Sequence, residues 1–548
     1  MRLICANTKE LREFSHSSSK QYAILSHRWR DEEITFQDLS GDMRSVSMKK
    51  GYQKLESACR QATRGGFRYI WVDTCCMNKD SSAELSEAIN SMYRWYHEAE
   101  VCYAYLFDVP DGVDPHADPS AKFANSEWFR RGWTLQELVA PRKMVFFSQG
   151  WKQLGTKASL KDILAKITGI GTGVLDGTMD PMAVSVATRM SWAASRHTSR
   201  PEDEAYSLMG LFNVNMPMLY GEGSEKAFIR LQEHIMEDSD DESIFAWINK
   251  SAPDNDLSLH GLLAPSSRYF AHSGGIQPYC SWDQRSSFRK TNKGLRISLN
   301  LTRIEGNIYI AAINCSAATN HYSGYLGVFL KRLDGPDEMG DEDEDYRHYA
   351  RIRIGSLPFL ESRGTMRVLY VHQNAASVAQ TAMNRIHLDH ILQLWQGPSS
   401  TQGYTLVRTS GTACSAEAAV MLGGREWIGV NTSVFLLPKG VEKTACVLEF
   451  EREWDKSHFN LCVYSTADFG IVFDVQEITR GGEIEQERNT YKPKTHPGQM
   501  LTTDRESIRV DAWPLVKGGR KYYIIDIVVT LTLRRDAQGF FRKWLRSA

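Results

Sequence analysis

One short segment combines residue types that can break a glycosidic bond. Residues 126–138 read SEWFRRGWTLQEL, with Trp133 and Glu137 four positions apart. On a helix this spacing brings an indole and a carboxylate to one face. A carboxylate beside an aromatic wall can stabilise an oxocarbenium-like transition state. In the alternative interpretation Trp133 faces the core and Glu137 pairs with Arg130 or Arg131, and the residues alone leave both open.

A second chemically capable group follows an expected strand at residues 22–25. Ser26, His27 and Arg28 offer a hydroxyl, an imidazole and a guanidinium, which together could hold a phosphate or the edge of a ribose. Trp29 could stack on a base or on a nicotinamide ring. The alternative is structural: His27 and Trp29 pack at the sheet edge, and Arg28 pairs with an acidic residue just after it.

A third group stands where the apolar run of residues 67–72 stops. Asp73 is either a cap of that strand end or a ligand to a ribose hydroxyl, and the two interpretations stay open. Cys75 and Cys76 could indicate thiol chemistry, but no basic residue precedes them closely, so buried loop packing is the favoured interpretation.

These residues must be positioned by the elements around them. The first 150 residues alternate strand-like and helix-like segments, which is typical of parallel βαβ units. The expected strands are residues 22–25, 67–72, 101–107 and 143–147, and the expected helices are 51–63, 82–98 and 128–139. In an open parallel sheet, ligands bind outside the carboxyl ends of the strands, near the point where strand order reverses. Ser26 to Trp29 and Asp73 should therefore meet at one edge.

Periodicity divides the chain into four expected regions. Residues 1–150 form the α/β domain, 151–250 are mostly helical, and 255–375 and 376–548 change to the two-residue period of strands. The two strand sets are either a duplicated module or unrelated, and the pattern does not decide. The acidic run at residues 341–345 is expected to be a solvated loop.

Composition excludes several classes of function. Lys and Arg number 65 against 66 Asp and Glu, so no bulk basic field favours nucleic acid. Ten scattered cysteines without a C-x-x-C pair indicate reduced thiols in a cytoplasmic protein. Charges near the N-terminus argue against a secretory signal, and no apolar run has the roughly 18 residues of a membrane span.

Several segments resemble the fungal heterokaryon-incompatibility (HET) domain in their amino-acid sequences and in their order along the chain. They are YAILSHRW at 22–29, the run from WVDTCCMNKD to YAYL at 71–106, RGWTLQELVAP at 131–141, the run from SWAASRHTSRPEDEAYSL to YGEG at 191–223, and SIFAW at 243–247. The resemblance covers roughly the first 247 residues. It implies an effector that triggers cell death after fusion of incompatible fungal cells.

HET domains in turn look like remote relatives of the Toll/interleukin-1-receptor (TIR) fold. The resemblance implies a flavodoxin-like parallel sheet, followed here by a helical extension and a β-rich, sandwich-like region. Trp133-x-x-x-Glu137-Leu138 is similar to the TIR helix whose Glu is catalytic in members that cleave NAD. It implies that Glu137 is the catalytic carboxylate of an NAD glycohydrolase, for which NAD is the substrate and no cofactor is needed. The implied substrate-binding residues are Ser26, His27, Arg28, Trp29, Asp73, Arg130 and Trp133.

The chain also departs from the TIR pattern in two places. The segment after Asp73 lacks the usual R-D-x-x-P-G loop, and extra residues separate Asp31 from Gly51. The ligand pose and the assembly interface of TIR domains are therefore not carried over to this chain. The expected partners are NAD or a related dinucleotide, other copies of the chain through the HET domain, and a protein trigger that binds the β-rich region. The alternative function is a non-catalytic adaptor that oligomerises or recruits partners.

Overall fold

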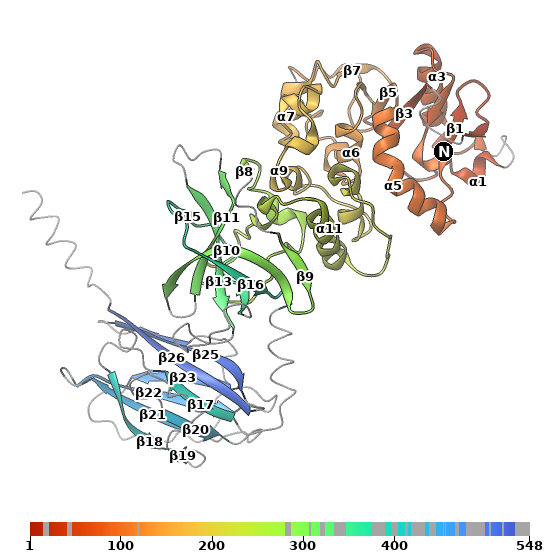
Figure 1. Cartoon of the computed structure of the whole chain (residues 1–548). Coiled ribbons are helices and arrows are strands. Elements are labelled where there is room, and N and C mark those ends of the chain that lie inside the picture. Colours follow the sequence, from red (N-terminus) through yellow and green to blue (C-terminus); the bar gives the residue numbers. More distant parts are fainter. Residues whose placement is uncertain are drawn as a thin grey trace, which may run out of the picture.

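The structure is a computed structural model of the whole chain. It describes residues 1–14, 21–40, 46–117, 121–279, 287–305, 308–317, 324–333, 347–374, 390–395, 404–410, 415–417, 433–437, 445–452, 454, 456–465, 471–477, 499–502, 506–517 and 520–531. The acidic run at 341–345 lies outside these residues. Along the chain, an α/β region is followed by a helical region and then by two β-rich regions (Figure 1).

The N-terminal sheet has the strand order β2-β1-β4-β3-β5-β6-β7. The strands are β1 (Arg2–Cys5), β2 (Leu11–Glu13), β3 (Tyr22–His27), β4 (Tyr69–Trp71), β5 (Val101–Tyr105), β6 (Met144–Phe147) and β7 (Gln153–Thr156). β3 is parallel to β4 and β5, and β5 is parallel to β6. β1, β2 and β7 extend the two edges antiparallel. The four parallel strands thus lie in the order β4-β3-β5-β6, so β3 has the next parallel strand of the sequence on one side and the one after it on the other. Strand order therefore reverses between β3 and β5.

The four parallel strands confirm the α/β prediction, and the antiparallel edges correct it. β1, β2 and β7 were not predicted, because strands of three or four residues are too short to show a period. β1 is nevertheless part of the core, since Leu3 and Ile4 are fully buried.

The helices beside this sheet are α1 (Phe36–Leu39), α3 (Tyr52–Arg64), α4 (Asp73–Cys76), α5 (Ser82–Glu98), the 3-10 helix η2 (Glu127–Arg130) and α6 (Thr134–Val139). α5 has its predicted bounds, and the Ser81 hydroxyl caps it by accepting from the Glu84 N–H. The single helix predicted over 128–139 is wrong: η2 and α6 are separated at Arg131 to Trp133, where the backbone of Arg131 is extended.

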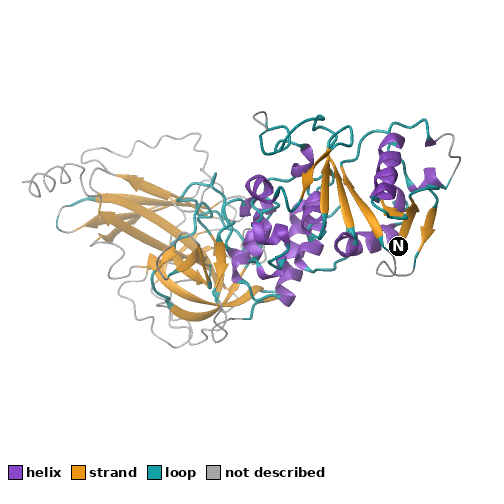
Figure 2. Cartoon of the chain, turned by 90° about the horizontal axis from the view of Figure 1, so that it is seen from above, coloured by secondary structure: helices purple, strands orange, loops and turns teal. Residues whose placement is uncertain are grey.

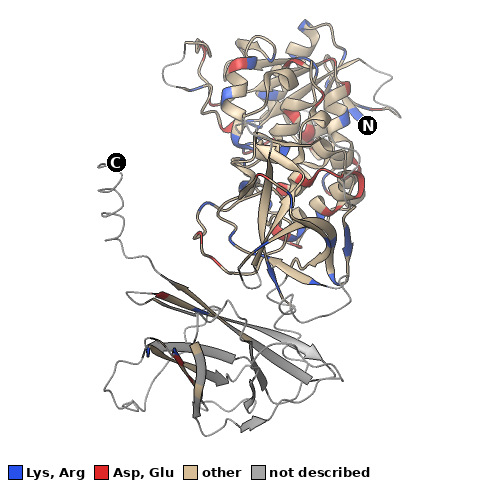
Figure 3. Cartoon of the chain, turned by 60° about the vertical axis from the view of Figure 1, so that its left-hand side comes forward, with Lys and Arg blue, Asp and Glu red and all other residues tan. Residues whose placement is uncertain are grey.

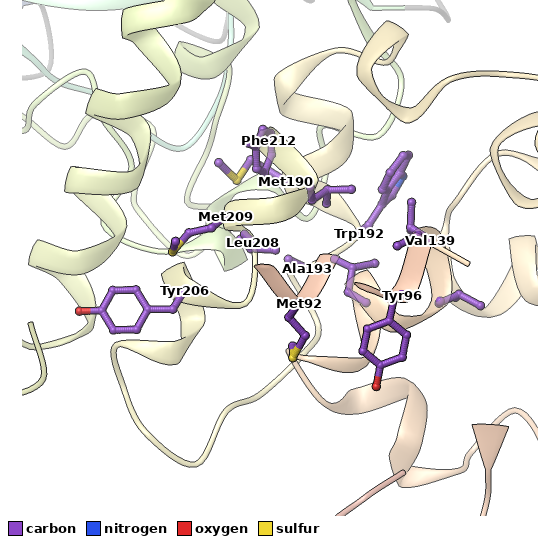
Figure 4. Packing of buried hydrophobic residues seen from close by; sticks show 14 of the residues in the cluster. Met92, Tyr96, Val139, Met190, Trp192, Ala193, Tyr206, Leu208, Met209 and Phe212 are labelled. Carbon is purple, nitrogen blue, oxygen red and sulfur yellow. The ribbon is translucent and has the colours of Figure 1, made fainter. Parts of the chain in front are cut away.

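A mostly helical region follows, as predicted. It contains α7 (Lys161–Thr168), α8 (Thr172–Asp176), η3 (Pro181–Ala183), α9 (Val186–Ser191), α10 (Asp203–Tyr206), η4 (Met209–Phe212), α11 (Ser224–Asp238), η5 (Glu242–Phe245) and η6 (Ser267–Phe270). Figure 4 shows Met92 and Tyr96 of α5 and Val139 of α6 near Trp192 and Leu208, all buried. The α/β region and the helices therefore share one continuous hydrophobic core.

The first β-rich region contains a sheet that closes on itself. Its strands are β9 (Arg289–Thr291), β10 (Gly294–Glu305), β11 (Ile308–Ile313), β13 (Tyr325–Arg332), β14 (His348–Arg351), β15 (Phe359–Leu360) and β16 (Thr365–Val371), and β8 (Ile276–Pro278) pairs separately with β12 (Cys315–Ala317). β11 pairs with both β10 and β13, which makes the sheet barrel-like. It contacts the helices through Lys290, whose ammonium lies 2.7 Å from a Glu233 oxygen.

The second β-rich region has two sheets. β17 (His390–Trp395), β19 (Ser415–Glu417), β20 (Ser433–Leu437), β24 (Gln499–Thr502), β25 (Glu506–Lys517) and β26 (Arg520–Leu531) form one, and β18 (Tyr404–Ser410), β21 (Ala445–Arg452), β22 (His458–Ser465) and β23 (Ile471–Glu477) form the other. The buried Arg452 of one sheet pairs with Glu506 of the other at 2.6 Å. Since the first region has one closed sheet and the second two open ones, their strand orders do not support a duplication.

Most helices lie between the N-terminal sheet and the β-rich part of the chain, and the others flank that sheet (Figure 2). Basic and acidic residues are interspersed over the N-terminal half (Figure 3), which fits the balanced composition. Among the described residues, no helix is both long and apolar enough to cross a membrane.

Candidate functional site

The predicted carboxylate Glu137 lies at the carboxyl end of the first parallel strand. β3 carries Ser26 next to its last residue, and the Ser26 hydroxyl donates a hydrogen bond to Oε2 of Glu137 on α6. The Trp128 indole N–H donates to the same Ser26 oxygen over 2.8 Å. Ser26 is fully buried, and Glu137 is 6% exposed. Serine and carboxylate thus meet across 111 residues of sequence at the edge where strand order reverses.

The environment of Glu137 makes its carboxyl titrate near neutrality. Burial raises its pKa to about 7, and the negative charge of Asp73 adds to this rise. The Ser26 hydrogen bond, the positive charge of Arg131 and the Tyr96 hydroxyl act in the opposite direction. A carboxyl half-ionised at neutral pH can serve in proton transfer or in charge stabilisation.

Beside Ser26, a second cluster is built on His27 and Asp73. His27 ends β3, and Asp73 begins α4 just after β4. The His27 Nε2 lies 2.8 Å from Oδ1 of Asp73, and the Trp29 indole N–H donates to Oδ2 over 2.5 Å. Burial alone would raise the pKa of Asp73, but its contacts with His27, Lys79 and Trp29 hold it well below the usual range. Asp73 is therefore an ionised carboxylate.

Two lysines complete this cluster. The Lys54 ammonium lies 2.7 Å from Nδ1 of His27 and also pairs with Glu33. Because an ammonium can only donate, Nδ1 accepts and Nε2 carries the proton given to Asp73. Burial, and then the charge of Lys54, lowers the pKa of His27, which agrees with a neutral ring. Lys79 lies over the Trp29 ring, 3.0 Å from its centre.

The residues expected to hold phosphate are divided between the interior and the surface. Ser26 and His27 are buried and already engaged, so they position Glu137 and Asp73 instead of facing a ligand. Arg28 and Trp29 have exposed side chains, and Arg28 pairs with Glu127 of η2. The acidic partner of Arg28 thus comes from a distant segment and not from the residues just after it.

Trp133 and Arg130 do not join Glu137. The break between η2 and α6 turns them away: the Trp133 indole donates to Asp203 of α10 over 3.1 Å, while Glu137 accepts from Ser26. Arg130 is exposed. Neither pairs with Glu137 through any interaction of the described residues. The aromatic side chains beside the carboxylate network are Trp128, which reaches it through Ser26, and Tyr96, and not Trp133.

The vicinal cysteines are packing residues, as favoured from sequence. Cys75 and Cys76 are buried, and burial raises the pKa of Cys75 to about 12 and that of Cys76 well above its usual value. A thiol held neutral in this way is a poor nucleophile.

Sequence reasoning missed three residues of this site. Trp128 was assigned only to a helix, and Lys54 and Lys79 were not singled out. Lys54 occurs on α3, 27 residues after His27, and nothing local connects the two. Lys79 lies shortly after Asp73, in the segment that departs from the TIR loop, and this nearness could have pointed to a cation facing Asp73.

Comparison with known proteins agrees with the sequence resemblance. Residues 22–116 match the family described as heterokaryon incompatibility protein (HET), and residues 226–326 match a domain of unknown function (DUF8212). The first match includes β3, β4 and β5 with Ser26, His27 and Asp73. It ends before Glu137.

A curated relative and a solved structure are also similar to parts of the chain. The vegetative incompatibility protein HET-E-1 of Podospora anserina is 49% identical over 223 residues, which are 40% of this chain and 16% of that protein. The chain thus matches less than a fifth of that relative's length. The lipid-binding protein Nakanori aligns with 29% of this chain and 80% of its own at 10% identity, but the TM-score of 0.18 carries no argument.

Proposed function

We propose that the first 250 residues or so are the effector of a fungal vegetative-incompatibility protein, and that they act as a TIR-like NAD glycohydrolase. The observation that carries the proposal is the Ser26–Glu137 pair at the carboxyl end of β3. The 49% identity to a vegetative incompatibility protein supports the biological role.

In the proposed reaction, the bond between nicotinamide and C1′ of its ribose breaks, and nicotinamide leaves with the bonding electrons. The ionised Glu137 stabilises the positive charge that develops on the ribose. Water then adds to C1′ and loses a proton, giving ADP-ribose. The Ser26 hydroxyl is a positioning group, because it holds one carboxylate oxygen and is itself oriented by the Trp128 indole.

The exposed part of the His27–Asp73 cluster is the proposed approach for the dinucleotide. Trp29 is 41% exposed and offers a ring face, and the Arg28 side chain is also 41% exposed. Arg28 can exchange its pair with Glu127 for the pyrophosphate, and Asp73 can accept from a ribose hydroxyl. This assignment leaves His27 and Lys54 as the buried support of Asp73.

The burial of Glu137 implies a resting state. With Glu137 6% exposed and Trp128 1% exposed, a substrate reaches the carboxylate only when the segment around η2 opens. Self-association through this region is the proposed trigger for opening. The same burial favours the second candidate function, an adaptor in which Glu137 has a structural role alone.

Expression in a fungal host distinguishes the two functions. The wild-type chain and Glu137→Gln are each induced, and viability and cellular NAD are followed. Glu87→Gln is the matched control, since Glu87 is exposed on α5. The glycohydrolase predicts death with NAD loss for the wild type and for the control, and neither for Glu137→Gln. Death that persists in Glu137→Gln without NAD loss would establish the adaptor instead.

A further inference from the structure

Arg131 is a half-buried cation at the carboxyl end of β3 that the proposed reaction does not yet use. The sequence offers it only as a pair for Glu137, and no such ion pair forms among the described residues. Its Nη1 instead donates to the carbonyl of His27, the last residue of β3, over 3.3 Å. The other N–H groups of its guanidinium have no partner among the described residues, and they remain accessible to solvent. Arg131 therefore has donors free for a ligand.

The backbone around Arg131 is held by several hydrogen bonds, so its side chain leaves from a fixed point. The Arg131 carbonyl accepts from Nη1 of Arg196 and from the Thr134 hydroxyl, both at 3.0 Å. The next residue, Gly132, donates its N–H to the His197 carbonyl over 2.9 Å. The buried guanidinium of Arg196 thus positions the backbone of Arg131. A binding group on a rigid backbone loses less conformational freedom when a ligand arrives.

Lys79 brings a second cation to the same edge of the sheet. It is half-buried, and its ammonium lies over the exposed Trp29 ring without a hydrogen bond or ion pair to any described residue. Burial lowers the pKa of Lys79, and the positive charge of Arg131 adds to this lowering, while Asp73 opposes it. Lys79 and Arg131 are therefore close enough to repel each other. An anion in contact with both would relieve this repulsion.

The carboxylates nearby are engaged with other donors. One oxygen of Asp73 lies 2.8 Å from Nε2 of His27, and the other accepts from the Trp29 indole over 2.5 Å. Glu137 is buried and accepts from the Ser26 hydroxyl. Neither carboxylate forms an ion pair with the two cations among the described residues. The free N–H groups of both cations are thus available to an anion from outside the chain.

We propose that Arg131 and Lys79 bind the phosphate next to the nicotinamide ribose of NAD. The identity of this ligand rests on the proposed function. The guanidinium fork of Arg131 matches two phosphate oxygens, and the Lys79 ammonium adds a point charge. Arg131 lies on the side of the sheet edge that carries Glu137, because its charge acts on that carboxyl. The more exposed Arg28 is then left for the second phosphate.

This assignment makes Arg131 a specificity-determining residue. It favours substrates that carry a phosphate on C5′ of the nicotinamide ribose. Nicotinamide mononucleotide has that phosphate, and nicotinamide riboside lacks it. The wild-type chain should therefore cleave the mononucleotide with a higher kcat/KM than the riboside, and Arg131→Gln should reduce that preference about tenfold or more. A merely structural role of Arg131 would affect both substrates alike.

Calorimetry on the full-length chain with ADP-ribose tests the site without requiring cleavage, and adenosine is the reference ligand without phosphate. Arg131→Gln and Lys79→Gln should each weaken ADP-ribose binding about tenfold or more, because each removes a charge-assisted contact. Arg60→Gln and Lys166→Gln are the matched controls, since both residues are exposed, on α3 and α7. Both controls should bind as the wild type does. Melting temperatures show that each variant is folded, and Arg131→Gln removes only one printed side-chain hydrogen bond.

The outcomes separate this site from the proposed function. Weaker ADP-ribose binding by folded Arg131→Gln and Lys79→Gln, with both controls unchanged, supports the phosphate site even if the wild type cleaves no NAD. No binding by the wild type at millimolar ADP-ribose, or equal binding by the wild type and both variants, overturns the site. NAD cleavage with the same preference for the mononucleotide in Arg131→Gln as in the wild type would also overturn it, and would leave the glycohydrolase standing.

Discussion

Replacement of Glu137 by glutamine should stabilise the chain, and more so as the pH rises. Glutamine keeps an acceptor for the Ser26 hydroxyl but has no charge to bury. In the wild type, burial raises the carboxyl pKa from 4.5 to about 7. The folded state therefore holds the proton more tightly than the unfolded state does. The bound proton stabilises the folded state fully below about pH 4.5, and this stabilisation is lost as the pH rises through 7.

The size of the effect follows from the two pKa values. A difference of one pKa unit corresponds to 1.36 kcal/mol. The Glu137 carboxyl therefore lowers the free energy of unfolding by about 2.5 kcal/mol more at pH 8 than at pH 5. Glu137→Gln should remove this cost. For a cooperative unit of 150 to 250 residues, 1 kcal/mol shifts the melting temperature by roughly 2–4 °C. The advantage of the variant should thus grow by about 5–10 °C between pH 5 and pH 8.

Thermal unfolding followed by tryptophan fluorescence measures this directly. The core that contains Glu137 also contains the buried Trp71, Trp128, Trp192 and Trp247, so its unfolding changes the signal. Glu87→Gln is the control for loss of an exposed charge. A gain in melting temperature of Glu137→Gln that is the same at both pH values would refute the destabilising effect of the buried, ionised carboxylate.

Further predictions concern the same network. If the ionised Glu137 stabilises the ribosyl cation, the rate of NAD cleavage should rise with pH through about 7, and a flat profile from pH 5 to pH 9 would exclude that role. Ser26→Ala should lower the free energy of unfolding by about 1–3 kcal/mol, because the Trp128 indole loses its acceptor, and chemical denaturation measures this loss. The same variant should move the midpoint of the pH profile of NAD cleavage upwards, since the Ser26 hydrogen bond lowers the pKa of Glu137. Thiol labelling of the native chain should leave Cys75 and Cys76 unmodified, because burial keeps both thiols neutral, and rapid labelling by a charged reagent would contradict their packing role. Gly132→Ala should lower the free energy of unfolding by about 1–3 kcal/mol, since its Cβ would overlap Thr198. A denaturation midpoint equal to that of the wild type would show that the α9–α10 loop moves freely.

The elements that carry the site could be predicted from sequence because each has a clear period or a clear end. α5 has its predicted bounds, since one apolar face and a capping serine define it. The apolar runs of β3 and β4 stop at the residues that begin the candidate site, and the rule on strand ends brought Ser26 and Asp73 to one edge without any contact being known.

The partners within the site could not be predicted, because they depend on contacts between distant segments. Lys54 meets His27, and Arg28 meets Glu127, across segments that no local pattern connects. The spacing of Trp133 and Glu137 was misleading for a local reason. The extended backbone at Arg131 ends η2, so α6 begins only at Thr134 and the Trp133 indole turns to Asp203.

Nicotinamide release from NAD by the purified full-length chain tests the central claim most directly. Wild type, Glu87→Gln and Glu137→Gln are compared over a wide range of protein concentration. We predict release by the first two, rising steeply with concentration because assembly opens the buried carboxylate, and none by Glu137→Gln. Equal release by Glu137→Gln, or no release by the wild type at the highest concentration, would contradict it.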